Sequence, residues 1–408
     1  MTVTVEASPA DVGLDAGRLA RLDEHFGRYV DDGRLAGYQL LVARRGKVAH
    51  LSTGGHRDRE AGLAYEPDTL VRIYSMTKPI TSVALMQLFE QGAFQLTDPV
   101  RDYLPAFGET PVWRGGSTVK PELEPQTELM RVWHLLTHTS GLTYGFHYTH
   151  PTDELYRRAG FELGAPKGMT LAEACDAWAG LPLRFQPGTR WNYSVSTDVV
   201  GRLVEVLSGQ PLDEYLRRHV FEPLGMADTA FDAVGREERL AALYVPDGER
   251  KAARFDPIGK LAARRQSFLS GGGGLVSSIG DYHRFLRCLL DGGTLDGERI
   301  LGPRTLGLMA VNHLPGGADI ASLAEDGTSE LARDGVGFGL GLAVMLDLGR
   351  SHTAGSVGDL SWGGAASTAF WIDPAEDLDV VFVTQLLPST THPIRPELRA
   401  LVYQAIVD

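Results

Sequence analysis

Hydrophobic positions recur along this chain at two spacings, one typical of helices and the other typical of strands. An apolar face at helical spacing predicts a helix over residues 15–32. Two short apolar runs then flank a polar turn, which predicts strands at 38–43 and 48–52. Near the other end of the chain, three apolar runs predict strands and a fourth predicts a helix, at residues 337–345, 365–372, 378–384 and 395–407.

The middle of the chain has a different pattern, rich in helices and loops. Helices are expected there near 131–137, 170–180, 196–208 and 212–220. Two strands before this region and three after it favour one five-stranded antiparallel sheet flanked by helices, an α/β fold of the α+β kind. We expect 1–100 and 266–408 to form this discontinuous α/β subdomain, 101–265 to form a mainly helical subdomain, and the active site to lie in the cleft between them.

A further helix begins near Ser75 and carries the most informative motif, Ser75-Met76-Thr77-Lys78. Pro79 is tolerated only close to a helix start, and the apolar run that follows ends at Gly92. Positions i and i+3 share a helix face, so the amine of Lys78 can lie beside the hydroxyl of Ser75. A serine with a base in contact is a candidate nucleophile for acyl transfer.

The same four-residue spacing occurs a second time, at Ser117-Thr118-Val119-Lys120. Glycines and prolines surround this copy, and they indicate a loop. A loop does not hold two side chains one helical turn apart. We therefore expect Ser117 to have no catalytic role.

Two later segments offer the remaining parts of an acyl-transfer site. Tyr193 follows a Pro-Gly turn and precedes a helix, so its phenol could share a proton with Lys78; a buried structural tyrosine is the alternative. The oxyanion needs two backbone donors, and we expect the amide of Ser75 to be one. Trp362-Gly363-Gly364-Ala365 could bring the other, because glycines allow a strand edge close to a substrate; an ordinary turn is the alternative.

Composition narrows the range of partners and compartments. The 408 residues are 43% hydrophobic and carry a net charge of −13, which disfavours nucleic acid and anionic membranes as partners. The first residues do not resemble a secretory signal, and no apolar run reaches the ~20 residues of a membrane span. Cys175 and Cys288 are solitary, so a cytoplasmic protein is expected.

Several other patterns carry weaker signals. His134 and His138 are four residues apart, but the sequence between them lacks the glutamate of a metalloprotease helix, so we expect no metal. The glycine run 271–274 lacks the lysine of a phosphate loop and is expected to let the backbone pass close to another element. His147 and His150 could rim the cleft. Four aromatic residues could line an apolar acyl pocket or be ordinary core or surface residues, namely Trp113, Tyr144, Phe146 and Tyr148.

The order of these motifs carries a family resemblance. Ser75-Met76-Thr77-Lys78 comes first, then a Thr-His-Thr-Ser-Gly segment at 137–141, Pro-Gly leading to Tyr193, the glycine run, and Trp362-Gly363-Gly364. The chain resembles the class C β-lactamase superfamily over nearly all its length, and most closely the family VIII carboxylesterases. The resemblance implies a β-lactamase/DD-peptidase-like fold, Ser75 as nucleophile, Lys78 and Tyr193 as the acid/base pair, and the amides of Ser75 and Ala365 as the oxyanion hole.

The departures from the β-lactamase pattern affect the expected substrate. Val195 stands where the lactamase Tyr-x-Asn motif has asparagine, and Trp362 stands where a lysine holds the lactam carboxylate. An indole has a single N–H donor and no charge, so it cannot replace that ion pair. We expect Trp362, Gly363, Gly364, Tyr144 and Val195 to contact the substrate, and the substrate to be a small neutral carboxylic ester.

This resemblance leaves alternatives open. The same acyl-enzyme could serve an acyltransferase, a β-lactamase or a D-amino-acid peptidase, and a non-catalytic β-lactam-binding protein is a further alternative. No cofactor is expected, the partner is a small-molecule ester, and the sequence does not indicate the oligomeric state.

Overall fold

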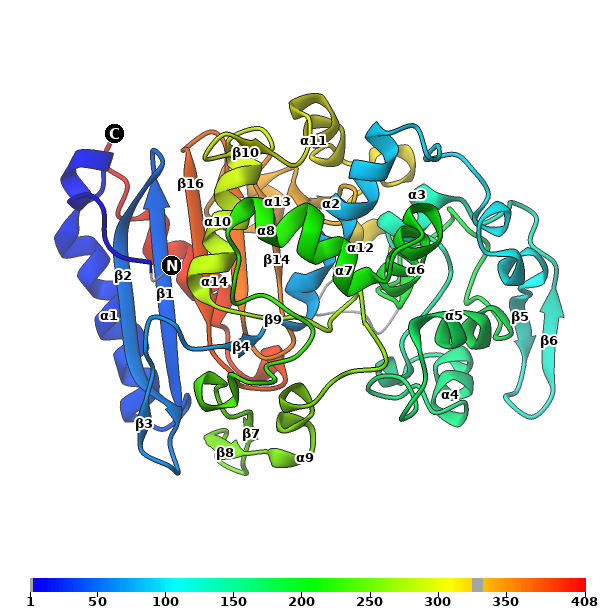
Figure 1. Cartoon of the computed structure of the whole chain (residues 1–408), viewed down its shortest axis with the longest axis horizontal. Coiled ribbons are helices and arrows are strands. Elements are labelled where there is room, and N and C mark those ends of the chain that lie inside the picture. Colours follow the sequence, from blue (N-terminus) through cyan, green and yellow to red (C-terminus); the bar gives the residue numbers. More distant parts are fainter. Residues whose placement is uncertain (1–2, 325–332) are drawn as a thin grey trace.

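The centre of the protein is one antiparallel sheet, drawn in Figure 1 from a computed structural model that describes residues 3–324 and 333–408. Within those residues the sheet has eight strands in the order β12-β13-β14-β15-β16-β1-β2-β3. Their bounds are β1 Gly37–Arg44, β2 Lys47–Asp58, β3 Leu63–Ala64, β12 Val336–Phe338, β13 Ala343–Met345, β14 Leu360–Gly363, β15 Ala369–Asp373 and β16 Leu378–Val383. The first strand pairs with the last, with Leu41 opposite Val381. The antiparallel α/β fold is thus confirmed, while the expected count of five strands is wrong.

The count differs because a turn divides one expected run and because two short strands, β3 and β14, were not expected. The run 337–345 forms two strands, since Gly341 adopts a φ of 98° and the N–H of Gly339 donates to Leu342 at 2.7 Å. Trp362 belongs to β14, a strand that the sequence pattern did not indicate, and β15 begins at Ala369 rather than 365. A glycine-rich turn therefore joins β14 to β15 next to the position expected for the site.

Helices cover both faces of this sheet (Figure 1). The helices α1 (Ala16–Asp31) and α14 (Ile394–Tyr403) pack on one face, where Leu40 and Val42 point. The helices α2 (Thr77–Glu90) and α10 (Ile279–Leu290) share the other core, with Leu41 and Ala43. Alternate side chains of a strand face opposite ways, so one fully buried strand supplies two cores.

The middle of the chain folds into the expected helices and packs against α2. They are α3 Val132–Leu136, α5 Leu171–Ala179, α6 Ser196–Ser208 and α7 Leu212–Leu216; the last continues through a π turn, Arg217–Phe221, into α8 Glu222–Leu224. Helix α6 lies directly against α2, and α3 and α5 in turn lie against α6. Figure 1 shows α3 to α6 at the end of the molecule opposite α1. This contact places the segment after Tyr193 beside the helix that follows Ser75.

Short elements complete the described chain. The remaining helices are α4 Pro151–Arg158, α9 Asp256–Gly259, α11 Pro303–Met309, α12 Ile320–Leu323 and α13 Leu348–Ser351. Four small antiparallel pairs join β4 Val71–Arg72 to β9 Val276–Ser277, β5 Val112–Gly116 to β6 Pro121–Glu124, β7 Tyr244–Pro246 to β8 Ala252–Arg254, and β10 Thr294–Leu295 to β11 Glu298–Arg299. Among the described helices, none combines the length and apolar character needed to cross a membrane.

Candidate active site

Ser75 lies in a single 3₁₀ turn, Tyr74–Met76, between strand β4 and helix α2. Tyr74 adopts a φ of 43°, in the left-handed region that residues with a side chain seldom occupy. Such a conformation persists only where the surrounding structure imposes it, and it is common at functional sites. The serine is therefore held at the start of α2 by a constrained backbone.

Helix α2 is a core helix rather than a surface helix. Every residue from Thr77 to Leu88 is buried, and the side chain of Lys78 is among the largest fully buried side chains in the described chain. A buried ammonium or amine requires polar partners. The site supplies three for Lys78.

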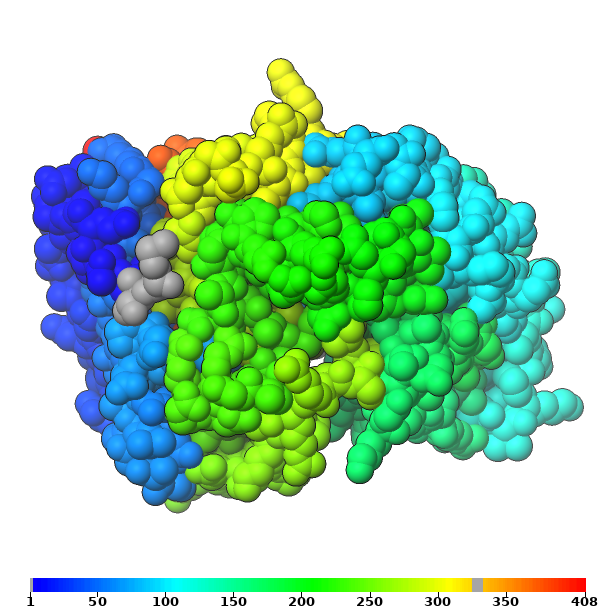
Figure 2. Space-filling model, viewed as in Figure 1, coloured from blue at the N-terminus to red at the C-terminus, as the bar shows by residue number. Residues whose placement is uncertain are grey.

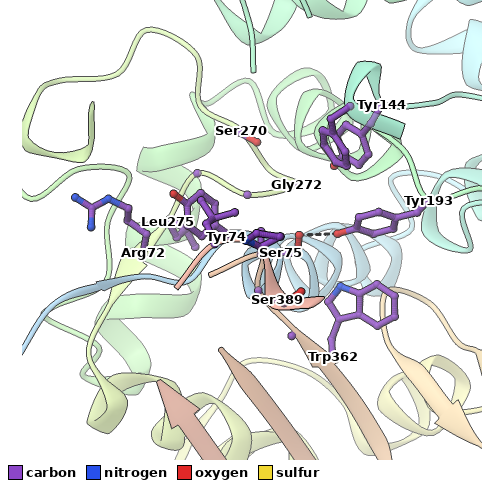
Figure 3. Close-up of a pocket in the computed structure, with 18 of the residues that line it drawn as sticks. Arg72, Tyr74, Ser75, Tyr144, Tyr193, Ser270, Gly272, Leu275, Trp362 and Ser389 are labelled. Atoms are coloured by element: carbon purple, nitrogen blue, oxygen red, sulfur yellow. Dashed lines mark hydrogen bonds between the residues drawn. The ribbon is translucent and has the colours of Figure 1, made fainter. Parts of the chain in front are cut away.

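The hydroxyls of Ser75 and Tyr193 are in direct contact. Tyr193 donates to the Ser75 oxygen at 2.6 Å, the contact drawn as a dashed line in Figure 3. Lys78 also approaches the Ser75 oxygen, at 3.5 Å, and its Nζ lies 4.4 Å from the centre of the Tyr193 ring. The three residues expected to work together thus converge on one oxygen atom.

Two further groups accept hydrogen bonds from Lys78. Its Nζ donates to the backbone carbonyl of Gly272 at 2.7 Å and to the hydroxyl of Tyr144 at 3.1 Å. Together with Ser75 these acceptors account for the three N–H groups of a lysine ammonium. The amine is therefore fixed in position from three sides.

Asp198 of helix α6 fixes the glycine run 271–274 close to Lys78. The Asp198 carboxylate accepts from the N–H of Gly272 at 3.0 Å and from the hydroxyl of Ser270 at 2.5 Å. A Cβ on Gly272 would lie 2.6 Å from Asp198 and 3.0 Å from the Tyr144 hydroxyl. Glycine is required here because any side chain would collide, which confirms the close backbone approach expected for 271–274.

Burial and neighbouring charge both shift the pKa values of the acidic groups around Lys78, namely Asp198 and Tyr144. Burial raises the pKa of Asp198, although the charge of Lys78 and the donors Ser270 and Gly272 oppose that shift. The pKa of Tyr144 lies well above its usual value, first because of burial and then because of the nearby Asp198. Tyr144 is therefore a neutral phenol that can both accept from Lys78 and donate.

Histidines near the site are kept neutral. Burial, and secondarily the charge of Lys78, holds the pKa of His138 well below its usual range, and burial lowers the pKa of His134 to about 4. His147 lines the pocket and donates to the backbone carbonyl of Tyr193 at 2.6 Å, so it supports the position of Tyr193. No cluster of three or more metal-binding side chains occurs in the described residues.

The turn after β14 reaches the segment that leads into Ser75. A Cβ on Gly364 would lie 2.4 Å from the carbonyl oxygen of Ile73, two residues before Ser75. The indole of Trp362 packs beside the Tyr193 ring, with 5.6 Å between ring centres, and against Phe338 at 5.2 Å. Figure 3 shows Tyr193 and Trp362 on the same side of Ser75. Gly363 and Ala365 line the same pocket.

These residues surround one pocket of about 730 Å³. Val195 and Tyr144 line it, as expected, and so do Phe146 and His147. Ligand pockets for drug-sized molecules fall between about 300 and 1,000 Å³. The site is thus large enough for a whole small molecule beside Ser75.

Other sequence candidates lie elsewhere. Ser117 and Lys120 form the exposed turn of the β5–β6 hairpin, where their backbones pair at 3.0–3.1 Å. Trp113 lies in β5 with its ring against His150, and the exposed Tyr148 donates to Glu162. Among the residues that line the described pocket, Glu162 is included, but the sequence candidates Ser117, Trp113, Tyr148 and His150 are not.

The sequence did not indicate the role of Asp198, Ser270 or Gly272. Asp198 stands in the first turn of α6, where an acidic residue is usually explained by the helix dipole. The available signal was its position beside buried valines, five residues after Tyr193. An acidic side chain on the buried face of a helix needs a buried partner.

The fold and this cluster define a class of proteins in which a serine and a lysine, one turn apart, face a tyrosine across a cleft. The Beta-lactamase family model matches residues 22–404, so the chain belongs to the β-lactamase family. It is 33% identical to Esterase EstB of Burkholderia gladioli over 418 aligned residues, which cover 97% of this chain and 98% of that protein.

Solved structures with a similar fold also include enzymes, a hydrolase and a synthase. The chain is similar to EstCE1, described as a hydrolase with promiscuous acyltransferase activity, with a TM-score of 0.79 and 27% identity over 95% of this chain and 99% of that chain. It is also similar to the simvastatin synthase LovD of Aspergillus terreus, with a TM-score of 0.81 and 25% identity over 96% and 98% of the two chains. The β-lactamase-like fold expected from the motifs is therefore confirmed.

Proposed function

We propose that this protein is a serine hydrolase that cleaves neutral carboxylic esters through an acyl-Ser75 intermediate. The observation that carries the proposal is the convergence of Tyr193 at 2.6 Å and Lys78 at 3.5 Å on the Ser75 oxygen. Similarity to Esterase EstB and to EstCE1 supports ester hydrolysis as the reaction.

In the proposed mechanism the Ser75 hydroxyl gives its proton to the Tyr193 oxygen as it attacks the ester carbonyl, so the reacting form is the one in which Tyr193 has first lost its own phenolic proton and is a phenolate beside the Lys78 ammonium. Lys78 Nζ lies 3.5 Å from the Ser75 oxygen and 4.4 Å from the centre of the Tyr193 ring, and it stabilises negative charge as it develops. The tetrahedral intermediate then collapses, the alkoxide leaves with a proton from the Tyr193–Lys78 pair, and an acyl-serine remains. Water attacks the acyl-serine by the reverse sequence of proton transfers and regenerates the free hydroxyl.

The oxyanion would be bound by the amides of Ser75 and Ala365. The contact between Gly364 and Ile73 supports this assignment, because it brings the β14–β15 turn against the segment that leads into Ser75. Removing one such donor typically costs about 10²–10³ in turnover.

The neutral character of the substrate rests on Trp362. Its ring is fixed between Tyr193 and Phe338 and presents an uncharged surface to the pocket. We place the site in the cleft between the subdomains 1–100 with 266–408 and 101–265, since its lining comes from both. We also propose the cytoplasm as the compartment, which suits the free thiols of Cys175 and Cys288.

Transfer of the acyl group to an alcohol is a second candidate. A pocket of about 730 Å³ has room for an acceptor beside the acyl-serine, and the similar protein EstCE1 is a hydrolase with promiscuous acyltransferase activity. Water and alcohol would compete for the same intermediate. Product analysis with and without an added alcohol separates the two outcomes.

The experiment that tests the proposal combines labelling with a substrate panel. A p-nitrophenyl phosphonate should modify Ser75 alone, as seen by peptide mass spectrometry, and Ser75→Ala should abolish hydrolysis of p-nitrophenyl acetate. Ser117→Ala is the matched control and should keep full activity. A label on another residue, or nitrocefin turnover that exceeds ester turnover, would overturn the proposal.

A further inference from the structure

The pocket extends well beyond the reacting groups, on the side of the glycine run. That extension is lined by aromatic side chains from four separate segments. Phe161 follows α4, Trp178 belongs to α5, and Phe231 and Phe268 come from the loops before the glycine run. We refer to Phe161, Trp178, Phe231 and Phe268, with Leu261, as the apolar wing.

Three rings of the wing, those of Phe161, Trp178 and Phe268, form a continuous wall. Phe161 and Trp178 lie 5.3 Å apart between ring centres, and Trp178 meets Phe268 edge-on at 6.1 Å. Phe161, Trp178 and Phe231 are each at most 5% exposed, so the wall is rigidly packed from behind. Side chains held in this way are pre-organised to bind a flat or extended apolar group.

This wall is continuous with the catalytic centre. A Cβ on Gly274 would lie 2.8 Å from the Phe231 ring, and Gly272 of the same run accepts the hydrogen bond of Lys78. Phe268 precedes Ser270, the residue that bonds Asp198, by two positions. A group bound to the wing could therefore belong to the same substrate molecule as an ester placed at Ser75.

The mouth of the wing is also apolar. Phe146, Leu163 and Leu261 line the pocket and are 40%, 70% and 51% exposed. Figure 2 shows the surface hollowed between the yellow-green segment around 256–268 and the green segment around 160–165. Large apolar side chains exposed around one opening are a mark of a binding site for an apolar ligand.

We propose that the wing binds a large apolar group of the ester, so that the preferred substrates carry a long alkyl chain or a fused ring system on one side of the ester bond. This inference rests on the proposed function and names its substrate class. An acetate ester of a small alcohol would leave the exposed apolar side chains at the opening, Phe146, Leu163 and Leu261, in contact with water. Each methylene buried there should raise kcat/KM by up to about fourfold.

The test uses two substrate series with the full-length protein. One is p-nitrophenyl esters from acetate to decanoate, and the other is acetate esters of alcohols from ethanol to octanol, followed by acid release. We expect kcat/KM to rise at least tenfold along one series. A flat or falling profile in both series would overturn the inference.

Substitutions in the wing test whether its side chains cause the preference for longer groups. Phe268→Ala and the exposed Leu261→Ser should each lower the long-to-short kcat/KM ratio, by about tenfold and threefold. Val119→Ser, at an 84% exposed position in the β5–β6 turn, is the control and should leave the ratio unchanged. Ratios that stay constant in both wing variants would also overturn the inference.

The two proposals fail in different ways. Loss of Ser75-dependent turnover of every ester would remove the proposed function. Turnover of p-nitrophenyl acetate without any preference for longer groups would remove only the inference about the wing.

Discussion

The hydroxyl of Tyr193 lies 2.6 Å from the Ser75 oxygen, although 118 positions separate the two residues in the sequence. Helix α6 brings them together, because it begins three residues after Tyr193 and packs along the Ser75 helix. His147 fixes the approach by donating to the Tyr193 carbonyl. The short contact is the most direct path for the serine proton.

Tyr193→Phe should therefore impair turnover while leaving the fold intact. Loss of a positioned proton carrier costs about 10²–10⁴ in rate, and we expect kcat for p-nitrophenyl acetate to fall by that factor with little change in KM. Steady-state kinetics and circular dichroism measure the two effects. Tyr148→Phe, which removes an exposed hydroxyl bonded to Glu162, is the control and should retain wild-type kcat.

Asp198 should set the pH at which the site works. Its negative charge adds to burial in raising the pKa of Tyr144, the phenol that accepts a hydrogen bond from Lys78; the other groups that face these residues are Tyr193, His138 and Cys175. Asp198→Asn removes that charge and lets Tyr144 lose its proton more readily.

We therefore expect the pH profile of kcat/KM to move to lower pH by about one unit in Asp198→Asn. A profile measured from pH 5 to 11 checks this prediction. Asp213→Asn, on the exposed side of α7, is the matched control. A variant that is slower at every pH with an unmoved profile would show that Asp198 only supports the structure.

Trp362 should determine the preference between neutral esters and anionic lactams. Trp362→Lys introduces a cation beside Tyr193, so it should lower ester turnover and raise nitrocefin turnover, changing their ratio by about tenfold or more. The same change at Trp113, in the remote hairpin strand β5, should leave the ratio as it is. An unchanged ratio in Trp362→Lys would show that the indole does not set the preference.

Stability should depend on pH through His283 of α10. Burial alone would lower the pKa of this histidine, but the Asp379 carboxylate at 2.6 Å outweighs burial and raises it. Because the folded-state pKa lies above the unfolded value of about 6.5, the stabilisation is complete below that value and is lost as pH rises through the folded-state pKa.

Urea unfolding from pH 5.5 to 9 tests this relationship. The free energy of unfolding of the wild type should fall above about pH 6.5. In His283→Gln this part of the curve should be flatter, while His219→Gln should follow the wild type. A parallel curve in His283→Gln would contradict the assignment.

The sequence by itself determined many of the helices and strands and indicated which residues take part in the proposed reaction. The helical spacing of Ser75 and Lys78, the position of Pro79 and the apolar runs of α1, α5 and α6 follow from local rules, since each depends on neighbours within a few turns. The motif order also indicated Tyr193 and the Trp362 segment. Short strands such as β14 were not predicted, because a run of four residues is too short to show an alternating pattern of apolar and polar positions.

Only the tertiary structure decided how these parts meet. The contact of Asp198 with Gly272, and of Gly272 with Lys78, joins three segments through backbone groups that leave no pattern in the residue types. The aromatic residues of the apolar wing likewise come one each from four separate segments. A pocket depends on which surfaces fail to fill the space between them, and that is a property of the packed chain rather than of any local sequence.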